Sequence, residues 1–302
     1  MNCRRVVRVA TCVVTSLCIA LILGADTEPY SYRYTPNPFC LPYGETQANS
    51  YHPYFDQPVD NGYVIDADAW GLNNADYNND KICMADPRLA DAFAIGSSTE
   101  VVRSHRFDGI AGYPNISEYP SSPILVSQLG DTTTSWSFTT DPSSSGAWDA
   151  AVDVLYSPAP TAAQASGDGH CDVEYPAGAR SPEHWGGEVM IWLSSHHADK
   201  PAGTWLTDLS VDGVRYSVWR RPASSLTWSI TSFVRMPATT SVTNLNIGAF
   251  TRDAVMFSNL PTSLYLCKVS AGFELWQGGS GLATDSFSVK DAVLVPSAGG
   301  HG

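Results

Sequence analysis

The sequence of 302 residues is poor in charge, and poorest in positive charge. Charged residues make up 16% of it, well below the roughly 25% of ordinary soluble domains. Its 17 Lys and Arg stand against 30 Asp and Glu, giving a net charge of -13 at pH 7, and no run of Lys or Arg interrupts this excess. Because such a surface repels phosphate, we expect no nucleic-acid partner.

Several motifs that mark enzyme classes are also absent. The chain has no G-x-S-x-G nucleophile elbow, no phosphate-binding P-loop, no H-E-x-x-H and no close C-x-x-C pair. His184, His196 and His197 come nearest to a metal pattern, but an adjacent pair cannot point to one side of a strand, so we interpret all three as loop histidines. We therefore expect no metal and no organic cofactor.

The one long apolar run stands at the N-terminus. Three arginines precede an apolar stretch, Val9 to Leu23, that ends in Gly24-Ala25. This order is typical of a secretory signal peptide, so we expect residues 1–25 to be removed and the protein to be extracellular. The alternative is an uncleaved anchor that would tie the protein to a membrane, although the run is short for a span of about 20 residues.

The remaining residues, 26–302, are expected to form one domain, since they show no internal repeat and no Ser-, Thr- or Pro-rich linker. They contain Cys40, Cys83, Cys171 and Cys267. An even number of cysteines in an exported chain favours two disulfides, for which three pairings are possible. A four-cysteine metal site is the alternative, and the lack of a close pair argues against it. No feature points to an obligate protein partner, so we expect a monomer.

From about Asn37 onward, short β-prone runs alternate with Gly, Pro, Asn, Asp and Ser. This pattern predicts an all-β sandwich or barrel. The one good helix candidate is Leu245 to Phe257, where apolar residues recur three or four apart. The longest irregular stretch, Ser157 to Gly187, is long enough to be functional or tied by a disulfide. The predicted strands include Ser135 to Thr139, Ala151 to Tyr156, Glu188 to Leu193, Tyr216 to Trp219, Trp228 to Val234 and Leu264 to Val269.

Two of these apolar segments carry a glutamate. In GGEVMIWL, period-two alternation places Glu188 on one face with Met190 and Trp192. A carboxylate, a thioether and an indole on one face suit the floor of a sugar-binding cleft, because sugars stack on aromatic rings and react with carboxylates. Trp192 could instead fill space beneath the substrate. The same alternation in AGFELW puts Glu274 beside Trp276, for which the same two interpretations are open.

Asp153, in the strand AVDVL, is a third acid whose apolar neighbours make a lone charge costly unless it is paired or hydrogen-bonded. A strand end or a solvated face would explain any one of the three acids, but together they indicate one shared site. Such a group of carboxyl residues is typical of glycoside hydrolysis. In retaining enzymes one carboxylic acid protonates the leaving oxygen, while a carboxylate about 5–5.5 Å away attacks the anomeric carbon. Repulsion between close carboxylates keeps one of them protonated.

At these residues the sequence resembles glycoside hydrolase family 12, the compact jelly-roll endo-β-1,4-glucanases and xyloglucanases. Residues 270–288, SAGFELWQGGSGLATDSFS, are similar to the family's acid/base strand. GGEVMIWL and AVDVLY match the strands that carry its nucleophile and its assisting acid. Weaker matches include an N-terminal strand at Cys40 and a W-G segment at Trp70, so the resemblance spans roughly residues 39–292.

The resemblance implies a β-jelly-roll sandwich of two antiparallel sheets with a concave substrate cleft and one α-helix. It implies that Glu188 attacks the anomeric carbon, that Glu274 serves as acid and base, and that Asp153 assists Glu188. The substrate would be a β-1,4-glucan, cleaved internally with retention. Trp70 would be a stacking platform, with a core position as the alternative interpretation. The substrate-binding residues would be Trp70, Met190, Trp192 and Trp276.

The resemblance also bears on the cysteines. Cys83 stands where the family has its second cysteine, which implies a bond between Cys40 and Cys83. Cys171 has no counterpart that we recognise in the family. We expect Cys171 to pair with Cys267, which precedes the acid/base strand, and so to pin the long loop beside the cleft.

The sequence departs from the family at two places. Ala67-Asp68 stands where the family has a pair of Asn, and the stretch from Ser157 to Gly187 is longer than the family norm. Either change could block or reshape the cleft. Two further interpretations therefore stay open: a non-catalytic jelly roll that binds β-glucan, and a xyloglucanase whose cleft admits branched chains.

Overall fold

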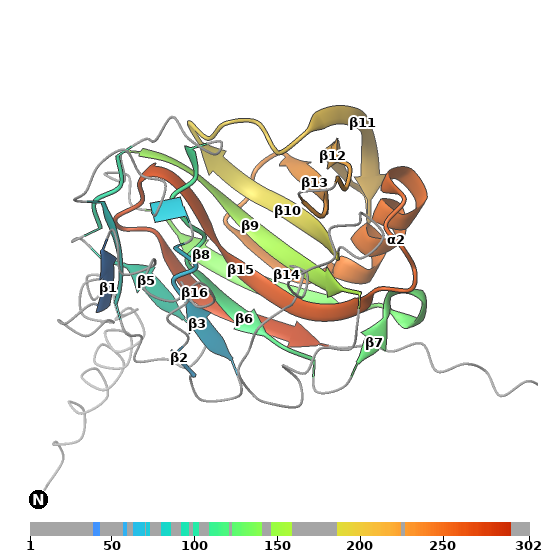
Figure 1. Ribbon diagram of the computed structural model, residues 1–302, viewed down its shortest axis with the longest axis horizontal. Coiled ribbons are helices and arrows are strands. Elements are labelled where there is room, and N and C mark those ends of the chain that lie inside the picture. The colour runs from blue at the N-terminus through green and yellow to red at the C-terminus, as the bar shows by residue number, and fades with distance from the viewer. Residues whose placement is uncertain are drawn as a thin grey trace, which may run out of the picture.

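Two β-sheets and one α-helix make up most of the regular structure of the described residues (Figure 1). The computed structural model describes residues 39–42, 57–58, 63–69, 71–72, 80–85, 92–96, 99–102, 109–120, 123–140, 146–158, 186–224 and 227–290. The predicted signal peptide, residues 1–25, and most of the long loop lie outside these residues. No helix in the described part of the chain has both the length and the apolar character to span a membrane.

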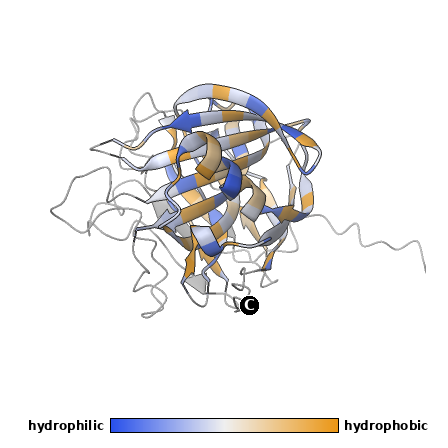
Figure 2. Cartoon of the chain, turned by 90° about the vertical axis from the view of Figure 1, so that its right-hand side faces the viewer, coloured by the Kyte–Doolittle hydropathy of each residue, from blue (hydrophilic) through white to orange (hydrophobic). Residues whose placement is uncertain are grey.

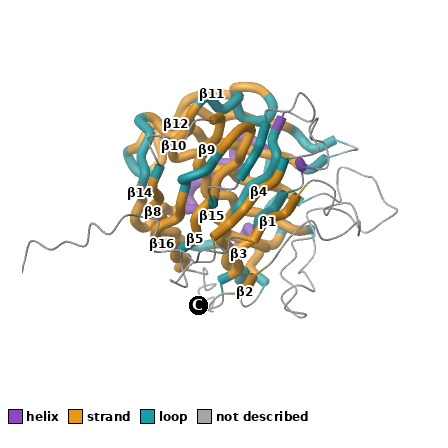
Figure 3. Tube along the Cα trace, turned by 90° about the vertical axis from the view of Figure 1, so that its left-hand side faces the viewer, coloured by secondary structure: helices purple, strands orange, loops and turns teal. Residues whose placement is uncertain are grey.

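The smaller sheet has six strands, and its β1, β4 and β5 lie toward the reader in Figure 3. Its order is β1 (Phe39–Pro42), β4 (Lys81–Ala85), β5 (Phe93–Ile95), β16 (Ala283–Lys290), β8 (Thr133–Thr139) and β14 (Ser241–Asn246).

The larger sheet has ten strands, all paired antiparallel except β10 with β13. Its order is β11 (Thr204–Val211), β12 (Val214–Arg221), β13 (Ser229–Met236), β10 (Gly187–His196), β9 (Gly146–Ser157), β15 (Tyr265–Gly278), β6 (Asn115–Glu118), β3 (Val64–Asp66) and β2 (Gln57–Pro58). The tenth strand, β7 (Ile124–Leu125), pairs with β15 and leads into a 3-10 turn, η6 (Val126–Gln128).

This architecture confirms the predicted jelly-roll sandwich. Each predicted strand lies in or overlaps an observed one, and most of the observed strands are longer. The largest extension is in β15, where the segment predicted from Leu264 to Val269 continues without a break through Glu274 to Gly278. Residues 265–278 therefore form one strand rather than two elements, and the alternation continues across Ser270, from Lys268 to Leu275, between two shifts of register with β9.

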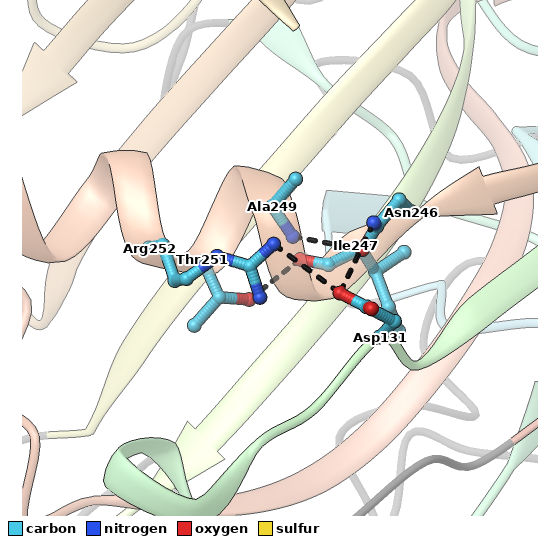
Figure 4. Close-up of polar contacts among 6 residues, drawn as sticks. All are labelled: Asp131, Asn246, Ile247, Ala249, Thr251 and Arg252. Atoms are coloured by element: carbon cyan, nitrogen blue, oxygen red, sulfur yellow. Dashed lines mark hydrogen bonds and ion pairs between the residues drawn. The ribbon is translucent and has the colours of Figure 1, made fainter. Parts of the chain in front are cut away.

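Helix α2 (Ile247–Ser258) confirms the predicted helix and starts two residues later than expected, because Asn246 caps it (Figure 4). The Asn246 side chain accepts a hydrogen bond from the backbone N–H of Ala249 at 2.9 Å, which satisfies one of the free amides of the first turn. Asp131 Oδ1 in turn accepts hydrogen bonds from Asn246 and Arg252, each at 3.4 Å. After the helix, Asn259 takes the left-handed conformation (φ 57°) common at helix ends.

The inward face of α2 closes one side of the core (Figure 2 views the molecule from the side of this helix). Phe250 is fully buried, and its ring meets Tyr216 of β12 and Phe233 of β13 edge to face, at 4.9 and 5.1 Å between ring centres. Edge-to-face contacts of this kind add to the stabilisation from burial. The helix is thereby fixed to β12 and β13, which lie on one side of β10 in the sheet.

The main core fills the space between the sheets, and its centre is aromatic. Phe273 of β15 is fully buried, with its ring centre 5.7 Å from those of Trp136 and Phe138 and 6.2 Å from that of Phe93. The Trp136 indole donates a hydrogen bond to Thr284 Oγ1 at 3.1 Å, so this buried donor is paired. Strand β15 is therefore tied firmly to the smaller sheet.

The face of the larger sheet that points away from this core is called here the outer face. Along β10, Val189, Ile191 and Leu193 lie in the core, as the alternation predicts. The alternate residues contribute to a second apolar cluster on the outer face, formed by Ala147, Ala151, Met190, Trp192, Ile230 and Trp276. The predicted substrate cleft would lie over this outer face.

Three of the four cysteines of the expected disulfides lie in described strands, namely Cys40 in β1, Cys83 in β4 and Cys267 in β15. Cys40 lies directly opposite Cys83 in the register of β1 and β4, and Cys83 and Cys267 are both disulfide-bonded. The register is compatible with the Cys40–Cys83 bond. Cys171 lies outside the described residues, so its pairing with Cys267 stays a prediction.

We expect Phe273→Ala to lower the free energy of unfolding by about 3–5 kcal/mol, because it removes the centre of the aromatic core. Phe257→Ala removes the same side chain from a position that is 42% exposed on α2, and it should cost less than about 1 kcal/mol. Urea denaturation of both variants measures the difference. Equal losses would contradict the central place given to Phe273.

Candidate active site

Strands β10, β9 and β15 bring the three predicted acids together on the outer face (Figure 1). Asp153 of β9 lies opposite Met190 of β10 on one side and opposite Ser270 of β15 on the other. Glu188 is two residues from Met190 and Glu274 is four residues from Ser270, so alternation keeps both on the same face. The sequence thus predicted correctly that the three acids share one neighbourhood.

Glu188 is only 7% exposed, and its neighbours favour the ionised form. The indole N–H of Trp228 donates a hydrogen bond to Glu188 Oε2 at 2.6 Å. Arg221, whose guanidinium lies 5.8 Å from the centre of the Trp228 ring, and Lys268 add positive charge. Burial raises the pKa of Glu188 above its ordinary value, and the Trp228 hydrogen bond, Arg221 and Lys268 offset part of that rise. The carboxylate is therefore oriented and its charge is stabilised, as a nucleophile requires.

Glu274 lies directly opposite Asp149 of β9. Asp149 is completely buried, and in the described part of the chain no N–H or O–H group donates to either of its oxygens. The carboxyl group of Glu274 is its neighbour across the strands, and a hydrogen bond between the two groups would need a shared proton, because two carboxylates are both acceptors.

The shared proton is held tightly. Burial raises the pKa of Glu274 well above its ordinary value, and the charge of Asp149, its hydrogen bond and the charge of Glu188 raise it further. Burial also raises the pKa of Asp149, to about 8. At neutral pH the Glu274–Asp149 pair therefore keeps a proton on the same face as Glu188.

Asp153 is buried beside Glu188. Burial and then the charge of Glu188 raise the pKa of Asp153 well above its ordinary value, whereas Lys268 lowers it. The Lys268 side chain is itself only 8% exposed, and its Nζ lies 4.0 Å from Oδ2 of the equally buried Asp66. The buried Lys268 thus lies near several acids, and Asp153 holds its proton more tightly than an exposed aspartate does.

The predicted substrate-binding residues Met190, Trp192 and Trp276 are 5%, 4% and 2% exposed. The rings of Trp192 and Trp276 meet edge to face, 6.1 Å between centres. This burial favours the interpretation that the two indoles fill space beneath a substrate and support the acids, rather than forming an open platform. Trp70 lies outside the described residues, so its role stays a prediction.

The sequence interpretation missed four side chains of this site: Asp149, Trp228, Lys268 and Arg221. Alternation alone could have found two of them, since Asp149 has the same parity as Asp153 in β9, and Lys268 the same parity as Glu274 in β15. Trp228 and Arg221 carry no local signal. They reach Glu188 only because β13 pairs in parallel with β10, and β12 with β13.

The histidines near the site form an aromatic stack. His196 is the last residue of β10 rather than a loop residue, and its ring stacks on Trp148 at 5.9 Å and meets His197 at 4.2 Å. His184 lies outside the described residues. Within the described ranges, no group of three or more His, Cys, Asp and Glu is placed to hold a metal ion.

Comparison with known proteins supports the resemblance in sequence. The sequence model of glycosyl hydrolase family 12 matches residues 178–291, which include Glu188 and Glu274. A curated protein, the probable cellulase Cel12b of Mycobacterium tuberculosis, is 26% identical over 103 residues. That match covers 34% of this chain and 66% of the relative's length.

Solved structures support the resemblance in fold. The endoglucanase Cel12A of Rhodothermus marinus is 26% identical, with a TM-score of 0.64, over 85% of this chain and 100% of its own. The native family 12 xyloglucanase of Bacillus licheniformis is 18% identical, with a TM-score of 0.60, over 85% and 100% of the two chains, and at that identity the likeness concerns the fold alone. The resemblance to family 12 is therefore confirmed.

We expect Asp149→Asn to lower the pKa of Glu274, because it removes the like charge that resists ionisation and offers an amide donor to the carboxylate. Carboxyl ¹³C NMR titration of glutamate-labelled protein, with the Glu274 signal assigned through Glu274→Gln, measures the shift. An unchanged or higher pKa of Glu274 would show that the pair does not share a proton.

We expect Trp228→Phe to raise the pKa of Glu188, because it keeps the aromatic ring but removes the hydrogen bond that favours the charged form. The same titration, with Glu188 assigned through Glu188→Gln, reports the change. A Glu188 pKa that stays where it was would mean that the indole only packs against the carboxylate.

Proposed function

We propose that this chain is a retaining glycoside hydrolase of family 12 that cleaves β-1,4-glucosidic bonds inside a glucan chain. The observation that carries the proposal is the opposite setting of two glutamates on one face. Glu188 accepts a 2.6 Å hydrogen bond from Trp228 and lies near Arg221 and Lys268, whereas Glu274 lies opposite the fully buried carboxyl group of Asp149. Two carboxyl groups whose surroundings favour opposite protonation states are suited to be nucleophile and acid.

In the first step, a Glu188 oxygen attacks the anomeric carbon while the proton of Glu274 passes to the departing glycosidic oxygen. The glycosidic bond breaks, and a glycosyl ester forms on Glu188. In the second step, ionised Glu274 takes a proton from water, whose oxygen attacks the same carbon and releases Glu188 as a carboxylate. Two displacements at one carbon retain its configuration, and the proton has returned to Glu274.

Two further acids would serve as positioning residues. Asp149 keeps a proton on Glu274 before the first step, and its repulsion makes ionised Glu274 a better base in the second step. Asp153, protonated beside Glu188, can donate a hydrogen bond that fixes the nucleophile and weakens as the ester forms. Lys268 limits the charge that this cluster accumulates.

The substrate class rests on the relatives. The proteins at 26% identity are named cellulase and endoglucanase, whereas the xyloglucanase shares only the fold. This difference supports an unbranched β-1,4-glucan as the preferred substrate. We further propose that residues 1–25 direct secretion, and that residues 26–302 act outside the cell as a monomer, where the oxidised Cys83 and Cys267 would be stable.

We expect Glu188→Gln to leave less than about a tenth of the activity on any glycoside, because the glycosyl ester can no longer form. Glu274→Gln should lower kcat on a natural glucan by about 10²–10⁴-fold, but much less on an aryl glycoside whose phenolate leaves without a proton. Reducing-sugar release and phenolate absorbance measure the two reactions.

The pair of variants provides its own control, since each removes one carboxylate without changing size. Proton NMR of the products adds the stereochemistry: the β-anomer should appear first. Early α-anomer, or a Glu188→Gln protein that retains more than a tenth of the activity, would contradict the assignment. A folded wild-type protein that binds glucan and releases no sugar would instead favour the binding module.

A further inference from the structure

A tryptophan far from the acids is left open on the edge of the larger sheet. Trp205 is 56% exposed and lies on β11, which ends the sheet three places from β10. Exposed indoles are costly in water unless they contact something, although a single exposed apolar residue is not by itself evidence of a site. The register and the polar neighbours of Trp205 supply further evidence.

Trp205 faces the same way as the acids. In the register it lies opposite Trp219 of β12, Trp219 lies opposite Ser232 of β13, and Ser232 lies opposite Met190 of β10. Met190 in turn lies opposite Asp153. Residues opposite one another in neighbouring strands share a face. An unbroken row on the outer face therefore connects Trp205 to the acid cluster.

The Trp205 ring is held in place although it is exposed. Its indole N–H donates a hydrogen bond to Asp208 Oδ1 at 3.2 Å, and Arg215 binds the other oxygen of Asp208 at 2.5 Å. Both anchoring residues lie on the outer face by alternation with Trp205 across the bulge of β11. A ring fixed before binding loses little conformational entropy on contact, and the flanking polar groups suit a hydroxyl-rich ligand.

We propose that Trp205, with Trp219 beside it, forms a distal subsite that stacks on a sugar ring of a β-glucan chain whose scissile bond lies over Glu188 and Glu274. The inference rests on the proposed function and extends it. Strands lie about 4.8 Å apart, so β11 is roughly 14 Å from β10. A ligand must therefore extend several sugar units beyond the acids to reach Trp205, and the affinity for short oligosaccharides should not depend on this residue.

The test compares chain lengths. Calorimetric titration of the Glu188→Gln protein with cellohexaose and with cellotriose gives two affinities free of turnover. Adding Trp205→Ala should weaken cellohexaose binding about three- to tenfold, and cellotriose binding clearly less. Trp205→Phe, which keeps a ring, should recover most of the loss. Met256→Ala, at a 68% exposed position on α2, is the matched surface control and should change neither affinity.

Two results for the Trp205→Ala protein would overturn the distal subsite: no loss of affinity for cellohexaose, or an equal loss of affinity for cellohexaose and cellotriose. If the affinities are unchanged and sedimentation shows that the substitution converts a dimer to a monomer, Trp205 is assigned to contact with a second copy of the chain. The proposed function is judged separately, by hydrolysis of glucan by the wild-type protein, and it survives each of these results if that hydrolysis is observed. If the wild-type protein neither binds nor cleaves β-1,4-glucans, both proposals fail together.

Discussion

The site depends on one constraint: four carboxyl groups from three neighbouring strands are placed on one face with little access to water, so they cannot all be ionised. Asp149 and Asp153 on β9, Glu188 on β10 and Glu274 on β15 divide the available partners unequally. Glu188 receives the indole hydrogen bond and the cations, so it bears the charge most easily. Among the described residues, Glu274 faces the carboxyl group of Asp149, and burial together with the charges of Asp149 and Glu188 raises its pKa against the opposing charge of Arg221. The difference between nucleophile and acid follows from these partners.

The sheet makes this crowding possible because antiparallel pairing fixes which residues stand opposite one another. Asp149 faces Glu274, and Asp153 lies between Met190 and Ser270, without any loop taking part. On the other face of the same strands, Phe273 and its aromatic neighbours supply stabilisation that offsets the cost of buried acids. Phe273 points into the core and Glu274 points to the outer face. A shift of β15 by one residue would exchange these two positions and disrupt both the core and the site.

The sequence predicted the parts of the site that alternation and a family-like motif reveal, namely the two sheets, the helix, and Glu188, Glu274 and Asp153 on one face. It did not predict the partners that set their protonation. Asp149 was within reach of the same period-two argument. Trp228 was not, because its contact with Glu188 spans 40 residues and depends on the parallel pairing of β10 with β13. Local sequence patterns predict which face of a strand a residue occupies, whereas its contacts with other strands depend on the strand order and the register.

The buried acids also link folding to pH. A carboxyl group whose pKa is raised by folding binds its proton more tightly in the native state than in the unfolded chain. Its stabilising contribution is complete below the unfolded pKa of about 4, and it is lost as pH rises through the folded value, which for Asp149 is about 8. The proton that the reaction would donate is thus the same one whose loss weakens the fold. Trp228 and Lys268 limit this cost at Glu188, because both oppose the rise in its pKa that burial causes.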